Sequence, residues 1–234
     1  AAFVLCAPAA DADGVFGGVR GDTVIRCNTV KITRATGSAG ANVSIASVYY
    51  DGQGWDHPVY YGYRLSQFYK NKPHIGLELE FTHAKAIADV TQTVSINGTT
   101  APLSTVMERL ELSHGLNFAL VNIAFRRPLR RNGALHRVLL IGRAGGGLTF
   151  PHVETVFEGV RKNGYQYGGP AWQVGGGVEY RIIGGLQAIA DLRVTMAHEN
   201  VLIGPNGSAG PKLSGPFMSG HFDIGLAYRL GSRP

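Results

Sequence analysis

The sequence predicts an all-β chain that closes into an antiparallel up-and-down transmembrane β-barrel. Three observations predict this class: long segments in which apolar and polar residues alternate, no apolar run near the ~20 residues of a spanning helix, and connections that alternate between short and long. Composition agrees, because only 16% of the residues are charged and 33 residues are glycine. It excludes a disordered chain, a coiled coil and a charged helical bundle.

The N-terminal segment is predicted to be the remnant of a secretory signal peptide, covering residues 1–12, with one barrel domain over residues 13–234. Residues 1–6 are apolar, and Ala10-Asp11-Ala12 has the A-x-A form of a cleavage site. The alternative is an ordinary short apolar segment. Export predicts a protein of the bacterial cell envelope, and two cysteines are too few for a zinc cluster or a disulfide framework.

The clearest strand is predicted at residues 217–230. Met218 and Ile224 fall on one face, whereas Ser219 and Asp223 fall on the other, because successive side chains of a strand point to opposite sides. The same alternation predicts further strands at residues 186–198, 171–182, 137–150, 114–126, 74–83 and 59–70. In this interpretation Leu77, Val194 and Ile224 face lipid.

The polar face of these strands predicts a crowded lumen. It carries charges of both signs and many glycines, which suits the interior of a small barrel better than a face exposed to bulk water. The charged residues expected there are Arg64, Glu78, Glu80, Arg143, Glu179, Arg181, Asp191, Arg193, Asp223 and Arg229. A soluble barrel or sandwich that binds lipid or a small solute remains the alternative.

Eight strands are the main expectation and ten the alternative, because single-chain bacterial barrels have even strand numbers. Eight result if residues 43–70 form one kinked strand, broken at Asp51-Gly52-Gln53-Gly54, and residues 15–34 supply the first strand. Ten result if residues 15–34 form a hairpin. An eight-stranded barrel is filled by side chains, so a wide diffusion channel is not expected.

Connection lengths predict how the barrel sits in the membrane. Residues 71–73 and 183–185 form tight turns, whereas residues 84–113, 151–170 and 197–216 are expected to be long outer loops. This orientation places the basic stretch 126–131 on the periplasmic side. That stretch is interpreted as a solvated turn, with contact to anionic lipid or to a periplasmic partner as the alternative.

Several motifs resemble those of one enzyme family. They comprise residues 50–52, 58–64, 79–85, 110–117, 151–154 and 169–173, of which Phe81-Thr82-His83-Ala84-Lys85 and Pro151-His152-Val153-Glu154 are the most specific. Together these motifs resemble the lipid A oxidase family of alphaproteobacterial outer membranes. The resemblance implies a barrel fold and O2-dependent oxidation of the proximal glucosamine of lipid A to 2-aminogluconate.

Strand parity predicts a site at the outer rim of the barrel. His83 and Lys85 continue the lipid-facing parity of Leu77, and His152 and Glu154 continue that of Phe150. His114 shares its parity with Leu116, Phe118 and Leu120 on the strand between. Neighbouring strands lie ~4.8 Å apart, so the three histidines are expected within about 10 Å of one another.

The predicted chemistry of this rim follows from its residue types. His83, His114, His152 and Glu154 are the candidate catalytic residues, and the three histidines, with Glu111 or Glu154, are candidate ligands for a divalent metal. Lys85 is the candidate ligand for a lipid A phosphate. The alternative is that these are interfacial and loop side chains that do not come together in the folded protein.

The expected partners are outer-membrane lipid and lipopolysaccharide, at the outer membrane of a bacterial cell. A net charge of +6 favours anionic partners, but no helix-turn-helix or RNA-binding signature supports nucleic acid. The alternative to an enzyme is a non-catalytic outer-membrane barrel with a structural, adhesive or lipopolysaccharide-binding role.

Overall fold

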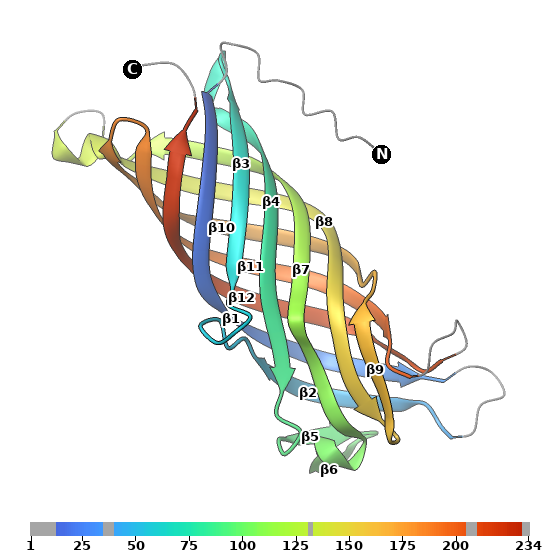
Figure 1. Cartoon of the computed structure of the whole chain (residues 1–234). Coiled ribbons are helices and arrows are strands. Elements are labelled where there is room, and N and C mark those ends of the chain that lie inside the picture. Colours follow the sequence, from blue (N-terminus) through green and yellow to red (C-terminus); the bar gives the residue numbers. More distant parts are fainter. Residues whose placement is uncertain (1–12, 35–39, 131–132, 205–209, 231–234) are drawn as a thin grey trace.

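The computed structural model describes residues 13–34, 40–130, 133–204 and 210–230 (Figure 1). The predicted signal-peptide remnant, residues 1–12, lies outside the described residues. The elements of the described chain, in order, are β1 (Asp13–Thr33), β2 (Val43–Asp51), β3 (Tyr61–Tyr69), β4 (Lys72–Ala88), β5 (Thr93–Ile96), β6 (Thr99–Pro102), η1 (Leu103–Thr105), β7 (Met107–Pro128), η2 (Ala134–Arg137), β8 (Val138–Phe157), β9 (Val160–Tyr165), β10 (Gly169–Ile183), β11 (Leu186–Leu202) and β12 (Lys212–Arg229).

The strands pair antiparallel and the sheet closes on itself. Pairing runs β12–β11–β10–β8–β7–β4–β3–β1, and β1 returns to β12 over a register that begins at Val15 opposite Arg229. The predicted antiparallel up-and-down barrel is therefore confirmed, and β1 is one long strand rather than a hairpin. Among the described residues, no helix has the length and apolar character to cross a membrane.

β2 and β3 together occupy one strand position in the ring, one after the other along β1. β3 pairs with the first part of β1, as far as Val19 opposite Gly62, and β2 pairs with its later part from Val24 opposite Asp51. Between them, residues 52–60 interrupt the strand, and a side chain at Gly52 or Gly54 would overlap the backbone of β1. This is the kinked strand broken near Asp51 that the eight-stranded expectation required.

The two ends of the barrel differ in how the strands connect. At one end β3 turns into β4 and β10 turns into β11 within two residues each, and β1 begins and β12 ends there (Figure 1). The other end carries the longer connections, so it is the outer end by the pattern of outer-membrane barrels.

The predicted long outer loops are wrong for most of their length. Residues 84–113, 151–170 and 197–216 largely extend the strands instead, because β4, β7, β8, β11 and β12 continue past the predicted ends. A tight turn at residues 158–159 folds β9 back onto β8, and the small β5–β6 hairpin occupies residues 93–102.

In the inner half of the barrel, which is the half nearest the two-residue turns, the side chains on the outside of the wall are apolar. Leu77, Val194 and Ile224 expose 43–44% of their surface, as predicted for lipid-facing side chains. They belong to a belt of exposed apolar residues that includes Phe81, Val121, Ile123, Phe125, Leu140, Leu148, Phe150, Trp172, Val174, Val178, Leu192, Met196, Met218, Phe222 and Leu226. A closed barrel leaves no backbone unpaired in hydrocarbon. This belt on a closed barrel places the chain in a membrane, and barrels of this kind are proteins of the bacterial outer membrane.

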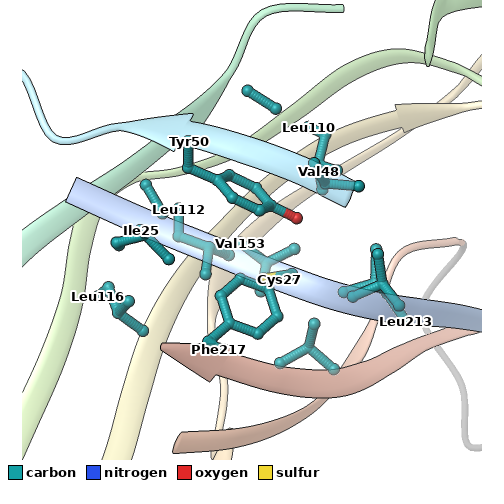
Figure 2. Packing of buried hydrophobic residues seen from close by; sticks show 14 of the residues in the cluster. Ile25, Cys27, Val48, Tyr50, Leu110, Leu112, Leu116, Val153, Leu213 and Phe217 are labelled. Carbon is teal, nitrogen blue, oxygen red and sulfur yellow. The ribbon is translucent and has the colours of Figure 1, made fainter. Parts of the chain in front are cut away.

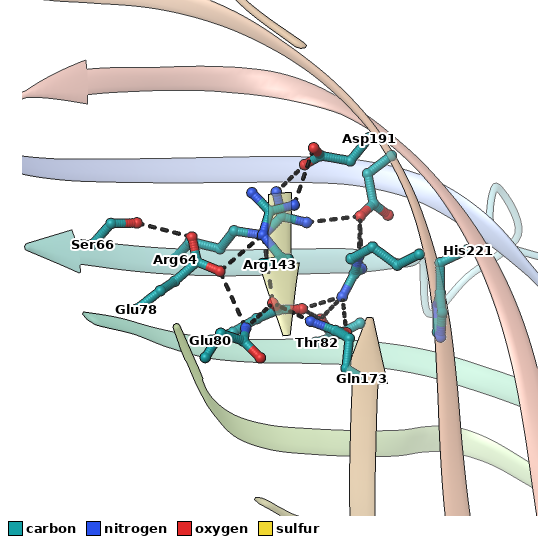
Figure 3. A network of polar contacts seen from close by, with 12 residues as sticks. Arg64, Ser66, Glu78, Glu80, Thr82, Arg143, Gln173, Asp191 and His221 are labelled. Atoms are coloured by element: carbon teal, nitrogen blue, oxygen red, sulfur yellow. Dashed lines mark hydrogen bonds and ion pairs between the residues drawn. The ribbon is translucent and has the colours of Figure 1, made fainter. Parts of the chain in front are cut away.

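Inside this belt the lumen is filled by paired charges (Figure 3). Arg64 pairs with Asp191 and with Asp223 at 2.9 Å, and Arg143 pairs with Glu78 at 3.0 Å. Arg193 pairs with Glu80 and with Asp223 at 2.6 Å. The predicted lumenal network is confirmed for these residues. Their side chains fill the centre of the barrel, where a charge stays buried only beside a partner of opposite sign.

The outer half of the barrel reverses this arrangement. Beyond the belt the inward side chains become apolar, and Ile25, Val48, Tyr50, Val153 and Phe217 pack into one buried cluster (Figure 2). Inward Phe217 and outward Met218 are adjacent on β12, so the switch happens without a change of strand parity. The outer half therefore has an apolar core and a surface exposed to water, whereas the membrane section has a polar core and an apolar surface.

Candidate functional site

The three predicted histidines lie on adjacent strands just beyond the outer edge of the belt. His83 is in β4, His114 in β7 and His152 in β8, and these strands pair in that order. The inward residues at this level are apolar, with Leu116 and Val153 both fully buried. The histidines are therefore on the outside of the barrel wall, where its surface leaves the hydrocarbon region.

The prediction that His114 faces lipid with the parity of Leu116, Phe118 and Leu120 is wrong for those three residues. Leu116, Phe118 and Leu120 point into the barrel, where they are buried, rather than toward lipid. His114 nevertheless points outward because β7 shifts register between Glu111 and Leu116, with Gly115 at a φ of +125°. The bulge reverses the parity of the strand, and an added Cβ at Gly115 would press on the His83 ring at 2.7 Å.

His114 and His152 form the centre of the site. Their ring centroids are 4.9 Å apart, and the His152 ring meets the Tyr165 ring edge-on at 4.7 Å. His114 Nδ1 lies 3.5 Å from Glu154 Oε2, which also accepts a hydrogen bond from the Ser113 hydroxyl at 3.1 Å. The His114 side chain is 57% exposed, so this pair is open to a ligand at the surface.

His83 is next to this pair but is held differently. Its ring stacks on Tyr61 at 4.8 Å, and its Nδ1 lies 2.8 Å from Asn117 Oδ1. The Asn117 amide nitrogen donates to the Phe150 carbonyl, so its oxygen must accept from His83 Nδ1. His83 Nε2 then carries the free lone pair, and this atom is buried without a hydrogen-bond partner.

Two arginines that sequence reasoning missed complete the cluster. Arg161, from β9, donates to Glu154 Oε1 at 2.8 Å, and Arg109 pairs with the same oxygen at 3.0 Å and with Glu111 at 2.9 Å. Arg161 reaches Glu154 because the tight turn after Phe157 folds β9 beside β8. The Glu-Gly turn at residues 158–159, followed by alternating residues, is the signal that would have predicted this hairpin.

Burial and charge set the protonation of the site near neutral pH. Burial lowers the pKa of His83 and of His152, which favours neutral imidazoles. Burial opposes ionisation of Glu154, but hydrogen bonds from Ser113 and Arg161 and the charge of Arg109 outweigh it and lower its pKa. The site therefore presents the neutral imidazoles of His83 and His152 beside an ionised carboxylate and two guanidinium groups.

Lys85, the candidate phosphate ligand, is not an exposed cation of this rim. Its side chain is buried beneath residues 52–60, and its Nζ donates to the Asp56 carbonyl at 3.0 Å. Burial lowers the pKa of Lys85, and the neighbouring Asp56, Asp22 and Asp51 oppose that shift. The exposed cations of this rim are Arg161 and Arg109 instead.

The described side chains of this site do not form a ready set of ligands for a metal ion. Across the described ranges, no group of three or more His, Cys, Asp or Glu side chains is arranged to hold a metal ion. His83 is held by ring stacking on Tyr61 and by its Nδ1 contact with Asn117, whereas His114 and His152 face each other at the surface. The cluster is a surface that combines imidazole rings, one carboxylate and two guanidinium groups.

Comparisons with known proteins give likeness in fold at low identity. No family model matches the chain, and no curated protein matches it. Neisserial surface protein A is 11% identical over 92% of this chain and 96% of its own, with a TM-score of 0.41. The outer membrane protein OprG from Pseudomonas aeruginosa is 13% identical over 95% and 98%, with a TM-score of 0.45. Ail, the attachment invasion locus protein of Yersinia pestis, is 11% identical over 95% and 100%, with a TM-score of 0.39. At these values the likeness says nothing about function.

Proposed function

We propose that this outer-membrane barrel binds the headgroup of lipopolysaccharide, at lipid A, through its outward-facing rim cluster. The rim cluster comprises Arg109, His114, His152, Glu154, Arg161 and Tyr165. One observation carries the proposal: this charged and aromatic surface stands on the outside of the wall, directly beyond the lipid-facing Leu148 and Phe150. A lipid whose acyl chains lie against the belt brings its headgroup to this height.

The chemistry of the rim cluster suits a phosphorylated sugar. Guanidinium groups pair with phosphate oxygens in a bidentate geometry, and both arginines retain exposed surface while bound to Glu154. Tyr165, whose hydroxyl donates to the His114 carbonyl at 3.0 Å, offers an exposed ring on which a sugar can lie. The filled lumen favours this outer surface over a role in conduction.

Oxidation of the proximal glucosamine is the second candidate function. The observation that favours it is the pair of unpartnered imidazole nitrogens, His83 Nε2 and His152 Nδ1, beside the exposed His114. Such groups can accept a proton from a sugar hydroxyl as its carbon is oxidised. The resemblance of the motifs that contain His83 and His152 to lipid A oxidase supplies the substrate and the oxidant, O2.

Mass spectrometry of lipid A separates the two candidates. Lipid A is compared between cells with and without the gene, and between cells that express wild-type, His152→Ala or His83→Ala protein. Oxidation predicts an added oxygen on the glucosamine that both variants lose while they keep the heat-modifiable gel migration of a folded barrel. Unmodified lipid A from cells with wild-type protein would defeat the enzymatic function.

Binding is tested on the purified barrel with lipid A in detergent micelles. The variant Arg109→Gln/Arg161→Gln should weaken lipid A binding about tenfold or more, because it removes two charge-assisted contacts. Arg26→Gln is the matched control, since Arg26 is an exposed arginine on β1, away from the rim cluster. Equal affinity in all three proteins would overturn the proposed function.

A further inference from the structure

The inner end of the barrel is strongly basic. The acidic residues described at this end are Asp13 and Glu179. They are outnumbered by the basic residues described there, which are Lys70, Lys72, Arg126, Arg127, Arg130, Arg137, Arg181 and Arg229. This end faces the periplasm when the longer connections face outward. The excess positive charge of the chain is therefore gathered where the wall meets the inner leaflet of the membrane.

Two of these arginines are free to bind a ligand. Arg126 points inward, where it pairs with Asp13 and donates to the Pro73 carbonyl at 3.0 Å. Arg127 and Arg130 are exposed, and within the described chain neither makes a hydrogen bond or an ion pair. Arg127 continues the outward face of β7 directly after Phe125, so its guanidinium stands at the inner edge of the oily belt.

A groove on the outer wall begins at these arginines. It is lined by His74, Phe125, Arg127, Leu129, Arg130 and Leu140, with Gly142 as its floor. An added Cβ at Gly142 would meet no atom within 4 Å, so this floor is open. The groove thus has a cationic end at the membrane surface and an apolar end toward the hydrocarbon.

The apolar end continues as a trough along β8. The outward positions after Leu140 are Gly142, Ala144 and Gly146, and they are paired with Phe125, Ile123 and Val121 of β7. On the other side β10 contributes Trp172, whose ring lies 3.3 Å from where a Cβ on Gly146 would be. Four residues of strand span roughly 13 Å, enough to seat a large part of an acyl chain.

We infer that this groove is a binding site for an anionic phospholipid of the inner leaflet. The phosphate is held by Arg127 and Arg130, with His74 beside them, and one acyl chain lies in the trough over Gly142, Ala144 and Gly146. A free phosphate or an anionic polymer would use only the cationic end. A lipid with a long chain and a negative headgroup matches both ends, and Arg–phosphate pairing supplies the preference for charge.

The trough provides its own reporter. The chain has two tryptophans, Trp55 and Trp172, so a Trp55→Phe background leaves only the tryptophan beside the trough. A phosphatidylglycerol with brominated acyl chains quenches Trp172 fluorescence when a chain occupies the trough. Brominated phosphatidylcholine, presented in the same micelles, measures binding that does not depend on net negative charge.

Phosphatidylglycerol is expected to bind about twenty-five-fold more tightly than phosphatidylcholine, at about fivefold per arginine. Arg127→Gln/Arg130→Gln should abolish this preference, whereas Arg137→Gln, which removes a charge at the same end outside the groove, should retain it. Gly142→Leu should weaken both lipids, because it fills the floor while leaving the arginines in place.

Four outcomes would overturn the site, and three of them concern the preference for the anionic lipid. These three are equal binding of the two lipids by the parent protein, an unchanged preference in Arg127→Gln/Arg130→Gln, and an equal loss in Arg137→Gln. Full displacement of phosphatidylglycerol by inorganic phosphate, together with no effect of Gly142→Leu, would assign the arginines to a free anion and also overturn it. Heat-modifiable gel migration checks that each variant is folded.

Discussion

Replacing Glu199 by glutamine should remove a pH-dependent weakness from the outer half of the barrel. Glu199 lies in β11, fully buried beside the apolar cluster, and neither of its carboxylate oxygens has a hydrogen-bond partner. Burial raises its pKa from 4.5 to about 7, against a smaller opposing effect of the Thr149 hydroxyl. The ionised form is therefore the unfavourable one inside the fold.

The sign and size of the effect follow from this rise. A carboxyl with a raised pKa in the folded state keeps its full contribution below about pH 4.5 and loses it as the pH rises through 7. At 1.36 kcal/mol per pKa unit, the loss is roughly 3 kcal/mol, or about a hundredfold in the equilibrium for opening the outer half. Glu199→Gln keeps the shape of the side chain and has no charge to bury.

Cys27 reports this opening. It is buried in the same apolar cluster as Tyr50, on the strand paired with β12, and burial raises the pKa of its thiol, which keeps it unreactive while the structure is closed. In a Cys6→Ser background, the rate at which a maleimide labels Cys27 measures the open population. The ratio of this rate between the parent and Glu199→Gln cancels the intrinsic pH dependence of the thiol.

The expected ratio is near one at pH 4.5 and rises by up to two orders of magnitude by pH 8. A ratio that stays constant across this range would refute the reasoning, because it would mean that Glu199 is ionised in the fold at no cost. A ratio that falls with pH would show that Glu199 has a hidden cationic partner.

Three other outcomes test the packing of the barrel. Arg193→Met should lower the free energy of unfolding in urea by about 3–5 kcal/mol, because it strands buried carboxylates; Arg34→Met, which breaks an ion pair whose glutamate is half exposed, should cost less than 1 kcal/mol, and equal losses would refute the difference. Gly177→Ala should prevent heat-modifiable folding, since its Cβ would overlap the Ala190 carbonyl and the Asp191 carboxylate, whereas Gly142→Ala should fold normally. Planar bilayers containing the purified barrel should show no ohmic conductance, and steady open-channel steps would contradict the filled lumen.

The membrane section of the fold was predictable because its exposed face is oily. Along residues 217–230 and 186–198, a period of two puts apolar side chains such as Ile224 and Val194 on one side of the strand without interruption. Only lipid or a protein core can cover such a face, and the paired charges on the opposite side pointed to a lumen. The strands and the residues of the lumenal network followed from this alternation.

The outer half was not predictable from the same pattern. There the inward face turns apolar and the outward face polar, so Phe217 and Met218 carry the same chemistry on opposite sides of one strand. Alternation fades where the chain passes this switch, and segments such as 151–157 therefore resemble loops in the sequence. Their strand pairing comes from neighbours that are distant in the sequence.

The candidate site shows the same limit. Parity placed His83 and His152 on the outside correctly, but the bulge at Gly115 and the covering of Lys85 by residues 52–60 depend on how the backbone deviates from a regular strand. Arg161 joined the cluster through a hairpin that sequence reasoning took for a loop. Period alone carries no information on bulges or on the path of a connection.

Spin-label accessibility tests the central claim most directly, namely that the belt of this barrel contacts hydrocarbon. In a background with both cysteines replaced by serine, labels at Leu77→Cys, Val194→Cys and Ile224→Cys are compared with a label at Tyr165→Cys in reconstituted vesicles. The first three labels should relax with oxygen, which concentrates in the bilayer, and the fourth with an aqueous nickel chelate. Nickel-dominated relaxation at Leu77, Val194 and Ile224 would show a wall that faces water and would contradict the account.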